Sequence, residues 1–144
     1  MSLKIDTLTS AAANWSIEVT PAGAAKVDSF SAILEPKTSV NVTFLPGSDP
    51  EDTYLVAKRL HEEGMIPIPH IAARSVKDIK HLDKMLTTLV KKASVKEVLV
   101  IGGGVDKPIG EFESSMQILK TGILQANGIT KIGVAGHPEG SPDI

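Results

Sequence analysis

The sequence predicts an α/β protein with a mostly parallel sheet. Segments of strand character alternate with segments of helical spacing, as in βα units with right-handed crossovers. The run at 97–101 is short and mostly apolar, as in strands covered on both faces. A chain of 144 residues fits one domain, over 1–144. Two architectures stay open, a doubly wound sheet and a (β/α)₈ barrel; a full barrel usually needs about 250 residues, so length favours the first.

The first half of the chain predicts two strands and two helices. Residues 15–20 alternate apolar and polar side chains and stop at Pro21, which predicts a strand. Apolar residues at helical spacing predict a helix over 22–34. A second strand is expected at 39–45. Asp49 is then a plausible N-cap, and the following helix is expected to end at Gly64.

The second half continues the alternation. Residues 66–71 form a third extended segment, although its two prolines would remove ladder bonds from a central strand. Ser75 and Asp78 resemble a capping box, which predicts a helix to about Ala93. Further expected elements are a strand at 97–101, a helix around 116–124 that ends before Asn127-Gly128, and a strand at 131–135.

Composition excludes several classes of function. The chain has no cysteine, so thiolate catalysis and zinc–thiolate sites are excluded. No apolar run approaches the length of a membrane span, and no secretory signal opens the chain, which predicts a cytoplasmic protein. A net charge of −2 and few aromatic residues argue against nucleic-acid binding. No metal-ligand spacing or nucleophile elbow is present.

Polar side chains fall at or just past the ends of the predicted strands: Glu18, Thr43, His70, Asp106 and His137. Both architectures place their sites at these carboxyl ends. The period of two along strands can align Glu18 beside Thr43 on one face. These positions therefore predict one wall of a pocket.

Structural roles compete with site roles at these positions. Glu18 could be solvated or paired with a lysine, but its apolar neighbours Ile17 and Val19 predict partial burial, which raises the pKa of a carboxyl and suits a proton donor. His70 could bond a neighbouring carbonyl. Asp106 could merely turn its loop beside Pro108.

The triple glycine at 102–104 invites a phosphate-binding interpretation, because bare backbone can approach an anion closely. It matches neither the dinucleotide-binding pattern nor the Walker pattern. A flat ligand passing the backbone would suit it equally well.

Five motifs in order resemble the methylenetetrahydrofolate reductase family, and together they cover nearly all of the chain. They are Ser16-Ile17-Glu18-Val19-Thr20-Pro21, Asn41-Val42-Thr43-Phe44, Pro69-His70-Ile71-Ala72-Ala73-Arg74, Val100-Ile101-Gly102-Gly103 and His137-Pro138-Glu139-Gly140-Ser141-Pro142. The family is a flavin-bearing (β/α)₈ barrel. The resemblance thus implies a partial TIM barrel of about five βα units, with later strands beyond Ile144.

The resemblance implies FAD-dependent reduction of 5,10-methylenetetrahydrofolate to 5-methyltetrahydrofolate with NAD(P)H. Glu18 matches the family's general acid. Other matched positions are implied to contact the flavin: Thr43, Phe44 and His70 as lining residues, Gly102 and Gly103 as backbone beside the isoalloxazine, and His137 where the family usually has a tyrosine.

One departure from the family follows the fourth strand. The family has Arg-Gly-Asp there, with the aspartate near the flavin, whereas this chain has Gly102, Gly103 and Gly104. Asp106, two residues on, is expected to substitute through a shifted loop.

Two other functions stay open at this point. A non-catalytic half-barrel would pair its strand edges with another copy, which predicts a homo-oligomer. An open-sheet nucleotide-binding domain is the third possibility.

Overall fold

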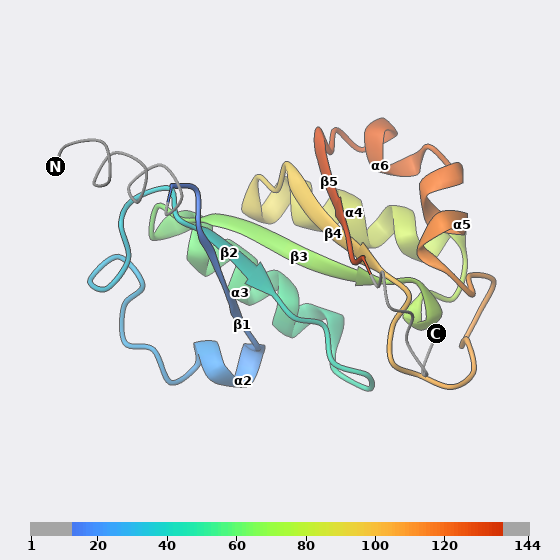
Figure 1. Cartoon of the computed structure of the whole chain (residues 1–144), viewed down its shortest axis with the longest axis horizontal. Helices are drawn as coiled ribbons and strands as arrows, with labels where there is room; N and C mark the ends of the chain where they lie inside the picture. Colours follow the sequence, from blue (N-terminus) through green and yellow to red (C-terminus); the bar gives the residue numbers. More distant parts are fainter. Residues whose placement is uncertain (1–12, 137–144) are drawn as a thin grey trace, which may run out of the picture.

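A five-stranded parallel sheet organises the computed structural model, which describes residues 13–136 (Figure 1). The strands pair in the order of the chain, β1-β2-β3-β4-β5. Their bounds are β1 Ser16–Val19, β2 Ser39–Val42, β3 Ile66–Ala72, β4 Glu97–Ile101 and β5 Lys131–Val134. The predicted α/β class with a parallel sheet is confirmed.

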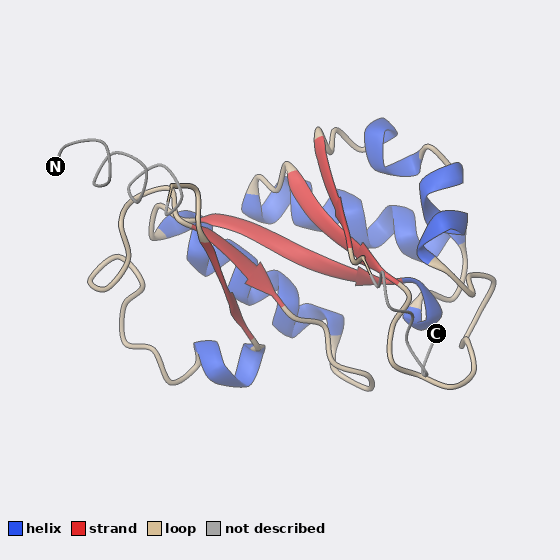
Figure 2. Cartoon of the chain, viewed as in Figure 1, coloured by secondary structure: helices blue, strands red, loops and turns tan. Residues whose placement is uncertain are grey.

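The helices lie on one side of this sheet (Figure 2). They are α2 Pro21–Ala24, α3 Pro50–Glu62, the 3₁₀ turn η1 Ala73–Ser75, α4 Ile79–Ala93, α5 Ser115–Lys120 and α6 Ile123–Ala126. A doubly wound sheet has helices on both faces and a point where the strand order reverses. Consecutive order with one covered face is instead the arrangement of a partial βα barrel, so the preference drawn from length is wrong. No helix within residues 13–136 has the length and apolar character to cross a bilayer.

Strand register separates an apolar face, which packs against the helices, from an opposite face that carries both polar and apolar side chains. Val40 and Val42 of β2 are fully buried, and they pack with Ile17 and Val19 of β1 against Leu60 of α3. Farther along the sheet, buried residues of β3 and β4 pack against α4, α5 and α6. The strand residues are Ile71, Val98 and Val100, and the helix residues are Leu82, Leu86, Leu89, Ile118 and Leu124. The residues between them face the opposite side, which we call the open face.

Two prolines are accommodated in the central strand β3. The amide of Ile66 donates to Thr38 O of the chain preceding β2, so every second amide of β3 points to β2. Pro67 and Pro69 therefore turn their nitrogens toward β4. The ladder between β3 and β4 begins only at His70, and no ladder bond is lost.

Three predicted helix boundaries are wrong. The helix expected over 22–34 stops at Ala24, and Ser29 Oγ accepts a hydrogen bond from the amide of Ala32, an alternative to helical bonding. Ser75 is not the N-cap of α4, because Asp78 accepts from the His81 amide instead. The helix around 116–124 is split at Gly122, which has a φ of 71°.

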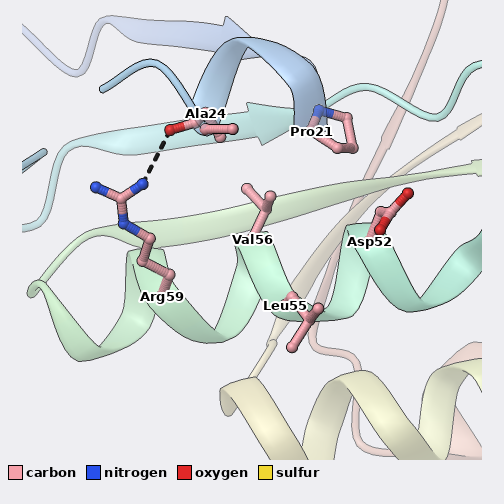
Figure 3. A pocket seen from close by; sticks show the side chains of 7 residues that line it. Pro21, Ala24, Asp52, Leu55, Val56 and Arg59 are labelled. Atoms are coloured by element: carbon pink, nitrogen blue, oxygen red, sulfur yellow. Dashed lines mark hydrogen bonds between the residues drawn. The ribbon is translucent and has the colours of Figure 1, made fainter. Parts of the chain in front are cut away.

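Arg59 and Glu63 of α3 hold the irregular segment that follows α2. The Arg59 guanidinium donates to the carbonyls of Ala24, Val27 and Asp28 at 2.9, 2.6 and 3.1 Å. Figure 3 shows the bond to Ala24 beside a cavity of about 250 Å³ between α2 and α3. Arg59 Nε also pairs with Glu63 at 2.7 Å. One helix thus organises a loop that has little regular bonding of its own.

Glu63 also binds the segment after α2, as an acceptor of backbone hydrogen bonds. Its Oε2 accepts from the amides of Phe30 and Ser31. Burial opposes ionisation of Glu63, but the hydrogen bonds from Arg59, Ser31 and Phe30 outweigh it and lower its pKa. The contact between Arg59 and Glu63 is therefore an ion pair at neutral pH.

Arg59→Met is expected to lower the free energy of unfolding by about 2 kcal/mol, because it leaves three carbonyls without their side-chain donor and removes the cation that pairs with Glu63. Lys58→Met is the matched control, since Lys58 pairs with Glu62 in the same helix but both side chains are about half exposed. That change should cost less than about 0.5 kcal/mol. Urea unfolding monitored by circular dichroism measures both, and equal losses would contradict a specific role for Arg59.

Candidate functional site

Polar side chains gather on the open face toward the carboxyl ends of β1, β2 and β3. Glu18 pairs in register with Asn41, and the amide of Thr43 donates to Val19 O at 3.0 Å, which extends the ladder. Since Val42 pairs with Pro69, the next position places Thr43 beside His70. Three of the predicted site residues, Glu18, Thr43 and His70, are therefore neighbours.

Glu18 and Thr43 are joined by a hydrogen bond. Thr43 Oγ1 donates to Glu18 Oε1. The partial burial predicted for Glu18 is wrong, because its side chain is exposed. Its apolar neighbours Ile17 and Val19 point to the helix side and cannot cover it. The carboxylate is thus oriented by a hydroxyl and accessible from the open face.

His70 is buried in the middle of the sheet. Its side chain is only 6% exposed, and its Nε2 has no hydrogen-bond partner within residues 13–136. Burial lowers the pKa of His70, and the negative charge of Glu18 partly opposes this shift. The ring is therefore neutral at pH 7, with a polar atom that a ligand on the open face could satisfy.

The glycine run follows β4 at the same end of the sheet, where the arrowheads of β3, β4 and β5 come together (Figure 1). Gly103 has a φ of 98°, and a Cβ there would lie 3.2 Å from Ala72 Cβ. Gly102 O accepts from the Arg74 amide at 2.9 Å, and Gly104 has open space around it. The backbone of this turn lies close against the end of β3.

Asp106 is exposed in the loop after β4. Within residues 13–136, no hydrogen bond or ion pair joins it to Glu18 or His70. Arg74 holds this loop, because its guanidinium donates to Val105 O at 3.3 Å and to Glu113 O at 3.1 Å. The structure therefore ties the Asp106 loop to the end of β3 but does not join Asp106 to the Glu18 group.

Phe44 lies apart from the open face. Successive residues of an extended segment point to opposite sides, and Phe44 lines a cavity with Ser75 and Val105 rather than accompanying Thr43. His137, the remaining predicted site residue, lies outside the described residues.

The spacing of residues in the sequence did not predict that Arg74 holds the loop after β4. Its targets are backbone carbonyls more than 30 positions away, and such acceptors leave no mark on residue type. Its place in the Pro69–Arg74 motif was the only available signal. Among residues 13–136, no three histidine or acidic side chains converge as a metal ion would require.

Comparison with known families adds no assignment, because the sequence matches no protein-family model. The chemistry of the site therefore depends on the geometry of Glu18, Thr43 and His70.

His70 should make stability fall on mild acidification. The unfolded chain takes up a proton at the ordinary pKa of 6.5, whereas the folded ring does so only at lower pH. Its stabilising contribution is complete above pH 6.5 and is lost as the pH falls toward the folded pKa, by at most about 1.4 kcal/mol per pH unit.

Urea unfolding between pH 7 and 5 measures this slope. His70→Gln should flatten it, while His61→Gln, at an exposed position of α3, should leave it unchanged. An unaltered slope in His70→Gln would assign the pH dependence to other groups.

Proposed function

We propose that this chain carries the flavin-binding, acid-bearing part of a methylenetetrahydrofolate reductase-like oxidoreductase. The observation that carries the proposal is the grouping of Glu18, Thr43 and His70 on the open face of a partial βα barrel. The ordered sequence motifs support it. The reaction is the reduction of 5,10-methylenetetrahydrofolate to 5-methyltetrahydrofolate with NAD(P)H, in the cytoplasm.

The residues at this end of the sheet fit a flavin. His70 Nε2 is a buried polar atom without a partner in the described part of the chain, and a cofactor amide or hydroxyl would satisfy it. Thr43 and the glycine turn at 102–104 would also contact the flavin. The turn lacks side chains, so a flat ring could approach its backbone. A bound flavin would supply the hydride in this reaction.

Glu18 is proposed to be the proton donor to the folate, and it would act in its carboxylic acid form. A ligand that covers the open face would favour this form by removing the carboxyl group from water. The Glu18 side chain is exposed on the open face, so a substrate nitrogen can reach it, and the Thr43 hydroxyl fixes its orientation. Protonation of that nitrogen opens the five-membered ring and leaves an iminium carbon that accepts a hydride. Asp106 is proposed to approach the cationic folate through movement of its loop, in place of the family's aspartate.

Two measurements separate flavin binding from Glu18 chemistry. FAD added to the chain should lose fluorescence as it binds, and Glu18→Gln should bind FAD equally well. In the longest protein that carries this sequence, Glu18→Gln should slow folate reduction about 100-fold or more, while flavin reduction by NAD(P)H is retained.

The matched control is Glu97→Gln. Glu97 lies on the same face but at the amino end of β4, where it pairs with Lys131 at 3.0 Å. Its loss should leave both half-reactions unchanged. Absence of FAD binding by the unmodified chain would refute the proposal.

A second candidate function is a non-catalytic half-barrel that associates with another copy. In the described residues β1 and β5 each pair on one side only, and Val134 of β5 is 55% exposed. Unpaired strand edges favour association. This candidate predicts a dimer or larger species by light scattering, with dissociation in Val134→Lys; a monomer at all concentrations would eliminate it.

A further inference from the structure

Three loops enclose a cavity at the carboxyl end of the sheet, which we call the rim cavity. It has a volume of about 430 Å³ and is formed by the loops after β2, β3 and β4. Small-molecule sites typically have volumes of about 300–1,000 Å³, and parallel sheets place them at this end. The position and size are therefore those of a ligand site.

One wall of the rim cavity is apolar. It consists of Phe44 together with Val105 and Ile109 from the loop after β4. Ile109 is 57% exposed, so much of its apolar surface is open to a ligand. An aromatic or branched aliphatic group would cover this wall favourably.

Other residues that line the cavity offer hydrogen-bond donors. Lys77 is the only fully charged residue that lines the cavity, and its amine forms no ion pair within residues 13–136. Ser48 and Ser75 also line it, and in the same part of the chain their hydroxyls have no hydrogen-bond partner. His81 Nδ1 accepts from the Lys77 amide at 3.2 Å, so the neutral ring carries its proton on Nε2 as a further donor.

Two acids near the cavity act as helix caps. Asp49 caps α3 by accepting from the Glu51 amide at 2.9 Å, and Asp78 caps α4 by accepting from the His81 amide at 2.7 Å. Neither carboxylate lines the cavity. In the described part of the chain, Lys77 is thus the one lining residue that carries a full charge.

The walls are held in place before any ligand arrives. A Cβ at Gly110 would lie 1.9 Å from Lys77 O, so only glycine permits this packing of the loop after β4. The Glu111 amide donates to Lys77 O at 3.0 Å, and the Ile109 amide donates to Arg74 O at 2.9 Å. Such preorganisation reduces the entropy lost on binding.

We propose that the rim cavity binds a small organic anion, with an aromatic or branched aliphatic body and one carboxylate or phosphate group. The body would lie against Phe44, Val105 and Ile109, and the anionic oxygens would accept from Lys77. The site is distinct from the Glu18 group, because Thr43 and Phe44 are successive residues of the extended segment after β2 and lie on opposite sides of it. It does not depend on the function proposed for that group.

The test is a titration of the chain with benzoate and with phenyl phosphate, followed by amide chemical shifts in NMR. The amides of Ser48, Lys77, Val105 and Ile109 should shift, with a dissociation constant of about 1 mM for such small probes. The stronger of the two probes identifies carboxylate or phosphate as the preferred group. Benzylamine, which has the same body and a positive charge, should bind at least about fivefold more weakly.

Two variants with matched controls locate the site. Lys77→Gln should weaken binding about fivefold, whereas Lys80→Gln, which changes an exposed lysine of α4 outside the cavity, should not. Ile109→Ser should also weaken it, while Ile33→Ser, at another exposed isoleucine, should not. Equal binding of benzylamine, shifts confined to residues 16–18, 41–43 and 70, or competition by FAD would each overturn the proposal of a separate anion site.

Discussion

Consecutive parallel pairing of the five strands is the constraint on which the rest of this structure depends. Because side chains alternate along each strand, pairing in register turns Val40, Val42, Val98 and Val100 to the helices. The same register turns Glu18 away from them. A slip of one residue would exchange the two faces, exposing the core and burying the carboxylate. The core and the candidate site are thus consequences of one geometry.

This geometry also produces two chemical environments from adjacent residues. Thr43 joins Glu18 on the open face, whereas Phe44 lines the rim cavity. His70 lies in the central strand, where neighbours on both sides bury it although no helix covers its face. The exposed carboxylate of Glu18 therefore lies close to the neutral imidazole of His70, which is buried.

Two arginines hold the parts of the chain that periodicity does not describe. Arg59 binds carbonyls of the segment after α2, and Arg74 binds carbonyls of the loop after β4. The planar guanidinium carries several donors, so one side chain can satisfy several carbonyls at once. In both places a residue on a regular element determines the shape of an irregular one.

The sequence by itself determined the elements whose cause is local, namely the alternation that makes β1 and the capping and spacing that make α3. Alternation also put Glu18 and Thr43 on one face of their strands, but strand pairing brought the two together. Tertiary contacts decided the rest. They ended α2 at Ala24, allowed prolines inside β3, and left Glu18 exposed while burying His70. Strand order, which excludes the doubly wound sheet, belongs to this second group. The physical reason is the distance along the chain over which each interaction acts. Residue spacing reflects interactions between residues a few positions apart, whereas strand pairing, burial and the binding of carbonyls by arginine join residues far apart in the chain.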